Sequence, residues 1–171
     1  MARHLKIPPC SLNELAFEHE AVERGHEVSS TKLEKILRTD MKTSSLIYGH
    51  LLPYVAPKDL IERIAVLRCE PKVLKTRLLQ RGYREEKVLQ NVESELIGAI
   101  SVDCFTRFGA SRVSEFDTTT TSSIDMSESI TRYFKDGGHC VIIDWLPFYS
   151  SVDELKRLLS RHPPGQSALI A

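Results

Sequence analysis

The chain has 171 residues, a length that suits one domain with a sizeable hydrophobic core. Its 23 basic and 23 acidic residues give zero net charge, so no overall field favours nucleic acid or an anionic membrane. Hydrophobic residues make up 42% and charged residues 27%, which is ordinary for a globular protein, and no apolar run approaches the roughly 20 residues that a membrane helix needs.

The N-terminus and the cysteines predict a cytoplasmic protein. "MARHLKIPPCSLNEL" has no apolar signal-peptide core, so we expect no secretion. Cys10, Cys69, Cys104 and Cys140 are scattered and form no C-x-x-C pair, so they indicate neither a zinc site nor a disulfide framework. We expect buried, reduced thiols and no protein-bound metal.

The first third of the chain predicts two short helices and a short strand. Ser11 is followed three residues later by Glu14, the spacing of a capping box, so a helix is expected from Ser11 to about Ala21. "STKLEKILRTD" (30–40) predicts a second helix with one apolar face. "SSLIYGH" (44–50) is a short apolar run that ends in Gly-His before a proline-marked loop.

The middle of the chain contains the clearest strand signal. "RIAVLRC" (63–69) is short and apolar on both faces, and Pro71 follows at a helix start, as in a buried parallel strand that leads into a helix. After the helix 71–82, the stretch 84–108 predicts one continuous amphipathic helix with Val88, Val92 and Leu96 buried.

The last third continues the alternation of strands and helices. A strand and polar loop (111–123), a helix (125–138), an apolar run (139–148) and a terminal helix capped by Ser150 or Ser151 are expected, with a frayed end after them. This alternation predicts one domain of the α/β class with a mostly parallel sheet.

One loop carries more charge than a turn requires. In "LLQRGYREEKVLQN" (78–91), Gly82 suits the residue just past a helix end, and the cations Arg77, Arg81, Arg84 and Lys87 surround it. Two interpretations follow from the pattern. The loop is either a solvated elbow between two helices or a mobile flap that closes over an anion.

Five stretches together resemble a known family: "GHLLPYV" (49–55), "VLRCEPKVLKTRL" (66–78), "RGYREEKVLQNVESE" (81–95), "FDTT" (116–119) and "DWL" (144–146). In this order they resemble the small adenylate kinases of archaea and their nuclear counterparts in eukaryotes. The similarity spans nearly the whole chain. It implies an α/β three-layer parallel sheet of the P-loop nucleoside-monophosphate kinase type, in a single nucleotide-kinase domain over residues 1–171.

The resemblance assigns roles to individual residues. It implies a lid over about 80–90 that closes on ATP, with Arg81 contacting the nucleotide; the other lid residues are Gln80, Gly82, Tyr83, Arg84 and Lys87. His50 matches a catalytic-site histidine that helps to position Mg²⁺ or water, although Tyr48 stands where many members have an acid. A histidine that is merely hydrogen-bonded at a strand end is the alternative.

The resemblance also implies a monophosphate-binding segment over about 11–33, with Ser11 and Arg24 as candidate contacts. Phe17 stands where some relatives have arginine. The loop 117–121 lies where the family passes near the adenine base, and a capped turn is the alternative there.

The family's phosphate loop is missing from the sequence. None of the 8 glycines heads a G-x-x-x-x-G-K-[ST] pattern, whose backbone amides would cradle phosphates. In the family this loop follows the first strand at the N-terminus. We therefore expect that the chain begins after that strand and loop, and a late start codon in the gene model is the preferred explanation.

The implied function is reversible phosphoryl transfer from ATP to AMP, giving two ADP, with Mg²⁺ accompanying ATP. The family also implies a role in ribosome small-subunit maturation, with a ribosomal protein as partner. Two alternatives stay open: an ATPase-type ribosome-assembly factor, and a truncated, non-catalytic binding module. No membrane and no direct nucleic-acid binding are expected.

Overall fold

The computed structural model describes residues 7–21, 29–40, 45–138 and 140–161. In chain order its elements are β1 (Pro9–Ser11), α2 (Leu12–Glu18), α3 (Ser30–Asp40), β2 (Leu46–Tyr48), α4 (Leu52–Val55), β3 (Ile64–Arg68), α5 (Pro71–Gln80), α6 (Glu85–Leu96), α7 (Ala99–Phe108), β4 (Val113–Asp117), α8 (Ser123–Asp136), the 3₁₀ helix η1 (Leu146–Phe148) and α9 (Val152–Leu159). Strands and helices alternate, which confirms the α/β class. No helix in these ranges is long and apolar enough to cross a membrane.

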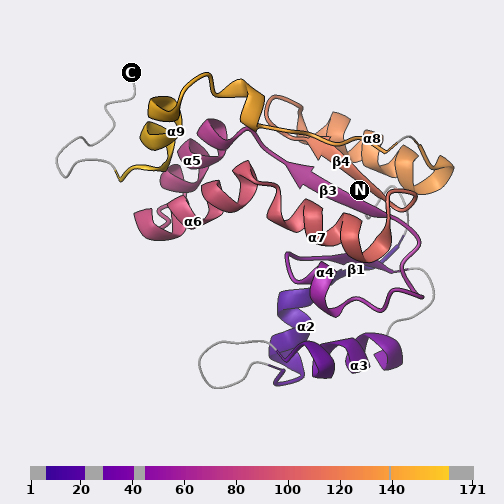
Figure 1. Ribbon diagram of the computed structural model, residues 1–171. Coiled ribbons are helices and arrows are strands. Elements are labelled where there is room, and N and C mark those ends of the chain that lie inside the picture. The colour runs from indigo at the N-terminus through magenta and orange to yellow at the C-terminus, as the bar shows by residue number, and fades with distance from the viewer. Residues whose placement is uncertain (1–6, 22–28, 41–44, 139, 162–171) are drawn as a thin grey trace.

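The strands form two separate parallel pairs. β1 pairs with β2, with Pro9 opposite Leu46, and β3 pairs with β4, with Ile64 opposite Val113. In the described ranges no strand ladder joins one pair to the other. β1 and β3 run toward the same side of the molecule in Figure 1, so the carboxyl ends of all four strands lie on that side.

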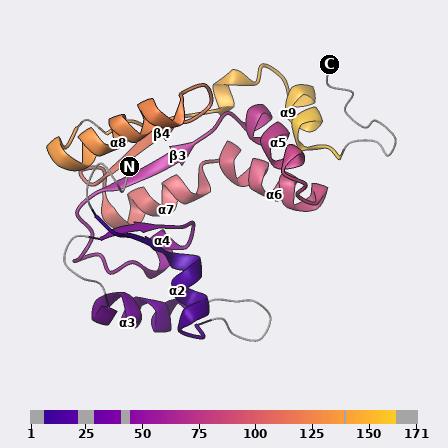
Figure 2. The same cartoon turned by 180° about the vertical axis from the view of Figure 1, so that it is seen from behind.

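Three apolar clusters hold the described elements together. One joins α2, α3 and α4 around Leu12, Leu33 and Leu37. A second lies between the β3–β4 pair and α7, around Ile64 and Phe108. The third joins α5 and α6 to the C-terminal residues; its members are Leu78, Val88, Val92, Leu96, Trp145, Tyr149 and Leu158. The hairpin of α5 and α6 therefore has a core of its own, at one end of the molecule (Figures 1 and 2).

Several helix boundaries follow the sequence signals. The Ser11 hydroxyl accepts a hydrogen bond from the backbone N–H of Glu14 at 3.3 Å, so the predicted cap is confirmed, although α2 ends at Glu18 rather than near Ala21. The predicted helix over 30–40 is α3. For α9 the cap is Ser151, whose hydroxyl accepts from Glu154 N at 3.2 Å.

The single long helix expected over 84–108 is wrong, because it is broken between α6 and α7. Gly98 has φ +64°, and a Cβ there would come within 3.2 Å of Arg68 Nη1. Arg68 Nη2 donates to Glu95 O at 2.9 Å, a carbonyl that a continuous helix would pair with residue 99. A buried arginine from β3 thus replaces a helical hydrogen bond. Val88, Val92 and Leu96 are buried, as predicted.

Two burial expectations are wrong in part. Cys69 and Cys104 are buried, but Cys10 is half-buried and Cys140 is exposed. Burial raises the pKa of the Cys104 thiol to about 11. Strand β3 buries Ile64, Val66 and Arg68 but leaves Leu67 57% exposed, so only one of its faces is fully covered.

Candidate functional site

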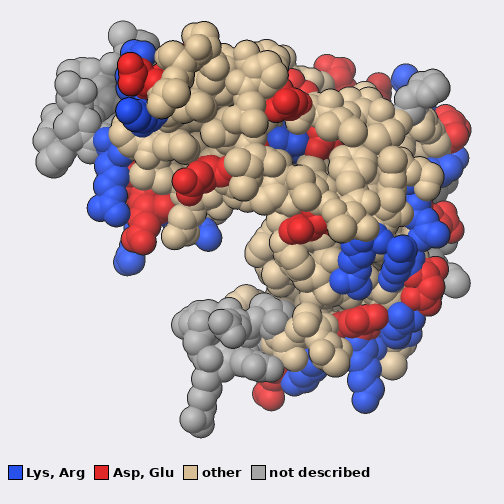
Figure 3. Space-filling model, viewed as in Figure 1, with Lys and Arg blue, Asp and Glu red and all other residues tan. Residues whose placement is uncertain are grey.

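The molecule is hollowed between two of its parts. Figure 3 shows this hollow between the α5–α6 hairpin on one side and the part built from α2 and α3 on the other. The strands β1 and β2 end on the side of the molecule where this hollow lies (Figure 1). In open α/β sheets, ligands gather outside the carboxyl ends of the strands. The hollow is therefore the place where the predicted lid and the predicted monophosphate segment would share a ligand.

The elbow at the tip of the hairpin has the backbone that the sequence predicts. Helix α5 ends at Gln80, Arg81 is its C-terminal cap, and Gly82 has φ +75°. The N–H of Gly82 donates to Leu79 O at 2.9 Å, and the N–H of Tyr83 donates to Leu78 O at 3.2 Å. These bonds satisfy carbonyls at the end of α5, and the positive φ explains the need for glycine.

The cations of the elbow are exposed. The side chains of Arg81, Arg84 and Lys87 make no hydrogen bond or ion pair with the residues that the structure describes. Gln80 is exposed too, and Tyr83 is 47% exposed. An exposed guanidinium without an internal partner keeps all of its donors for a ligand.

Arg77 does not belong with these cations, although the sequence grouped it with them. It donates to Thr118 O at 3.1 Å and to Thr119 O at 2.7 Å, and it also contacts Cys69 Sγ at 3.3 Å. Arg77 therefore fixes the loop after β4 against the start of α5. Its donors are used inside the molecule.

His50 is exposed in the turn between β2 and α4. Gly49 precedes it with φ +147°, and a Cβ at Gly49 would come within 3.0 Å of Leu12 Cβ. The close packing of this turn on α2 therefore requires glycine at residue 49. Tyr48 is 50% exposed. No described residue makes a hydrogen bond with the His50 ring. The described contacts therefore give no support to the alternative in which His50 is merely hydrogen-bonded at the strand end.

The monophosphate segment is described only in part. The Ser11 oxygen serves as the cap of α2, and Phe17 is 72% exposed. Arg24 lies outside the described residues. Lys32 Nζ donates to Glu20 O at 2.8 Å, so the start of α3 is linked to the residues just after α2.

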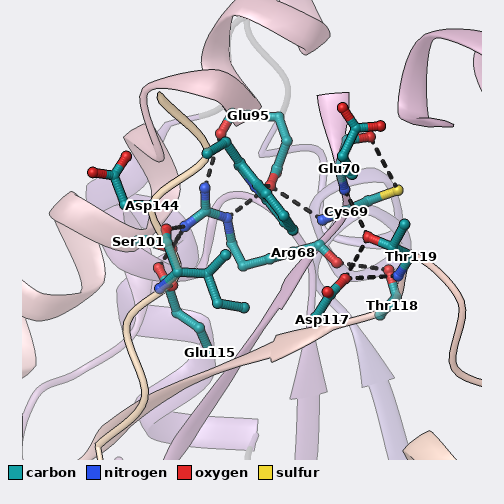
Figure 4. A network of polar contacts seen from close by, with 12 residues as sticks. Arg68, Cys69, Glu70, Glu95, Ser101, Glu115, Asp117, Thr118, Thr119 and Asp144 are labelled. Atoms are coloured by element: carbon teal, nitrogen blue, oxygen red, sulfur yellow. Dashed lines mark hydrogen bonds and ion pairs between the residues drawn. The ribbon is translucent and has the colours of Figure 1, made fainter. Parts of the chain in front are cut away.

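A buried ionic centre at the end of β3 was missed by the sequence reasoning (Figure 4). Arg68 is 3% exposed; its Nε donates to Glu95 Oε1 at 2.7 Å, and its Nη1 donates to Glu115 Oε1 at 2.6 Å. Burial opposes the charge of this guanidinium, yet the hydrogen bonds and charges of Glu95 and Glu115 raise its pKa above the ordinary value. One signal was available: an arginine inside an apolar strand must find acidic partners.

The loop after β4 is the capped turn that was the alternative to an adenine contact. Thr118 donates its N–H and its hydroxyl to Arg68 O, at 2.8 and 2.7 Å. The Asp117 carboxylate accepts from the N–H of Thr119 at 2.8 Å and from the Thr119 hydroxyl. Glu70 N in turn donates to Thr119 Oγ1 at 2.9 Å. These side chains hold the ends of β3 and β4 together.

Comparisons with known proteins agree with the resemblance. A family described as "AAA domain" matches residues 1–98. Three archaeal proteins named "Putative adenylate kinase" are similar to most of the chain. The protein of Pyrococcus abyssi is 31% identical over 134 residues, which cover 77% of this chain and 72% of that protein. The protein of Thermococcus onnurineus is 30% identical over 147 residues, with 83% and 79% covered. The protein of Thermococcus kodakarensis is 29% identical over 163 residues, with 92% and 89% covered. These matches, together with the α/β fold and its parallel strands, show that the chain belongs to the adenylate kinase-like family.

Proposed function

We propose that this protein catalyses reversible transfer of the γ-phosphoryl group of ATP to AMP, giving two ADP. One observation carries the proposal in a member of this family: the elbow presents Arg81, Arg84 and Lys87 exposed and without partners among the residues that the structure describes. A purely structural elbow needs Gly82 but gains nothing from three unpaired cations. An elbow that closes over nucleotide phosphates needs both.

Arg81 is the proposed ATP-binding residue. Phosphoryl transfer asks little covalent chemistry of the protein, which positions two nucleotides in line and balances the charge on the transferred group. A guanidinium offers several fixed donors to phosphate oxygens. Closure of the elbow would bring this charge to the phosphates and exclude water from the hollow. Arg84 is the N-cap of α6 and Lys87 lies in the first turn of that helix; both are exposed and would add to the positive potential near Arg81.

The segment of α2 and α3 is the proposed AMP side, across the hollow from the elbow. Since the Ser11 hydroxyl already accepts from Glu14 N, a contact from Ser11 to AMP would use its hydroxyl proton or its second lone pair. Arg24 is the candidate for the AMP phosphate. Its charge suits a monophosphate dianion better than a neutral hydroxyl does.

Magnesium would enter with ATP as part of the substrate. In the described parts of the chain, no three His, Cys, Asp or Glu side chains gather to hold a metal ion. Mg²⁺ keeps several waters and binds through one or two carboxylates plus substrate phosphates, so it needs no three-ligand protein site to accompany ATP. We assign His50, at the end of β2, to helping to position Mg²⁺ or water near the phosphates.

The printed sequence contains no G-K-[ST] loop, so the residues named here account for the lid and the AMP side only. The test therefore uses the protein expressed from its own genomic locus with a C-terminal tag, whatever its natural N-terminus. ADP is measured from ATP plus AMP and from each nucleotide alone. AMP-dependent ADP formation supports the kinase. ADP and phosphate formed from ATP without AMP would identify the ATPase instead, and no turnover would leave only a binding module.

A further inference from the structure

The α5–α6 hairpin joins the rest of the molecule at two junctions. The chain enters α5 through Cys69 and Glu70, directly after β3, and leaves α6 through Ile97 and Gly98. Any change in the angle between hairpin and sheet must occur at these junctions. Helix α5 has 10 residues and is therefore about 15 Å long, so a rotation of roughly 10° at its base moves the elbow by about 3 Å.

Both junctions hold an acid that is bound by an aromatic side chain from the C-terminal part of the chain. At the end of α6, Glu95 Oε1 accepts from Trp145 Nε1 at 2.8 Å. At the start of α5, Glu70 Oε1 accepts from the Tyr149 hydroxyl at 2.6 Å. Trp145 is 3% exposed and Tyr149 is 7% exposed, so both donors are buried, whereas the two acids that accept from them are half-buried.

The same two acids also bind the junction backbone. Glu95 Oε1 accepts from Cys69 N at 3.1 Å and from Arg68 Nε at 2.7 Å. Glu70 Oε2 accepts from Val73 N at 2.9 Å, as the cap of α5. Each acid is thus shared between the hairpin base and an aromatic ring.

Residues 141–159 bridge the sheet and the hairpin. At their start, Glu115 N donates to Val141 O at 3.1 Å, and Arg68 Nη1 donates to Ile143 O at 3.1 Å, which holds them to β4 and β3. At their end, Leu158 packs in the core of α5 and α6, and Lys75 Nζ donates to Leu158 O at 2.7 Å.

From this arrangement we infer that residues 141–159 are a strap that sets the angle of the hairpin, and that Trp145 and Tyr149 are positioning residues for the Arg81 elbow. The inference rests on the proposed function only where it assigns the elbow to catalysis. A misplacement of about 1 Å can cost roughly 100-fold in rate, and a rotation of roughly 10° at the base of α5 would move the elbow by about three times that distance.

The test compares three variants. Tyr149→Phe removes only a hydroxyl, Trp145→Phe removes the ring N–H, and Tyr133→Phe is the matched control. Tyr133 is 8% exposed, and its hydroxyl donates to Arg112 O at 2.8 Å, away from the junctions. Hydrogen–deuterium exchange is followed at the amides of Cys69, Glu70 and Val73, and separately across β3 at 64–67. Turnover is measured on the same samples.

We expect both strap variants to exchange the three junction amides about tenfold faster, with β3 unchanged and Tyr133→Phe like the wild type. In the active enzyme, kcat should fall about tenfold or more while KM for AMP is kept. Wild-type exchange at the junctions in both variants, or equal acceleration throughout β3, would overturn the strap. Faster junction exchange with wild-type kcat would overturn the positioning role. An inactive wild-type protein would instead refute the proposed function, and the exchange result would still decide on the strap.

Discussion

Replacing Arg68 by methionine should destabilise the protein severely. The substitution introduces an apolar side chain of similar length and removes the five hydrogen bonds that Arg68 donates. Their acceptors are Glu95 Oε1, Glu95 O, Glu115 Oε1, Ser101 Oγ and Ile143 O. Glu115 has a side chain that is 1% exposed, so its carboxylate would stay buried without its cation. Breaking a buried pair in this way costs about 3–5 kcal/mol. That is a large part of the roughly 5–15 kcal/mol by which a domain is stable.

The assay is urea unfolding followed by far-UV circular dichroism and by the fluorescence of Trp145, the 1 tryptophan in the sequence. With a urea dependence of about 2 kcal/mol per molar, the midpoint should fall by roughly 1.5–2.5 M. Arg38→Met is the matched control. Arg38 also makes a two-oxygen contact, with Asp59 at 2.9 Å, but its side chain is 45% exposed, so its midpoint should hardly change.

A second variant separates the loss of attraction from the cost of a stranded charge. Replacing Glu95 and Glu115 by glutamine in the Arg68→Met background leaves no buried charge at this centre. The triple variant should therefore recover at least about 1 kcal/mol relative to Arg68→Met. The reasoning fails if Arg68→Met costs less than about 1 kcal/mol, or if the triple variant is no more stable than the single one.

Three further predictions concern the site and the pH dependence of stability. Arg81→Ala in the active protein should lower kcat/KM by about 100-fold, whereas Arg132→Ala on α8 should change it less than about twofold; equal kinetics for both would return the loop to a solvated elbow. His50→Ala should depress kcat more than the affinity for nucleotide, and turnover per folded molecule that stays at the wild-type value would make His50 structural. Burial raises the pKa of the Cys104 thiol from 9.0 to about 11. The stability that the protonated thiol contributes is therefore complete below about pH 9 and is lost as pH rises toward 11. The loss is at most about 2.7 kcal/mol. Urea midpoints at pH 8 and pH 11 should therefore differ less in Cys104→Val than in the wild type; an equal difference would assign the alkaline loss to other groups.

Local signals predicted the elements whose boundaries depend on near neighbours. Ser11 caps α2 through an N–H only three residues away, and Pro71 starts α5 directly after β3. Gly82 turns the chain because its own φ of +75° closes the end of α5. In each case the physical cause lies within about one helical turn of the residue. The sequence pattern was therefore sufficient.

Long-range contacts decided the features that local signals missed. The spacing of Val92, Leu96 and Ala99 continues a helix without interruption, and only the guanidinium of Arg68, which comes from β3, explains why Gly98 breaks it. The interaction of Glu95 with Trp145 spans 50 residues of sequence, and no period or cap encodes it.

The arginines of this chain separate into two kinds once their acceptors are known. Arg68 and Arg77 lie at the end of β3 and in α5, and their donors are taken by carboxylates and carbonyls from distant segments. Arg81 is one helical turn beyond Arg77 along the same helix, yet it is exposed and no described residue accepts from its side chain. Both are arginines near the end of one helix, so helical spacing alone does not tell which of them has internal acceptors. The distinction has a physical consequence: substitution of Arg77 should disturb folding through Thr118 and Thr119, whereas substitution of Arg81 should disturb only what happens in the hollow.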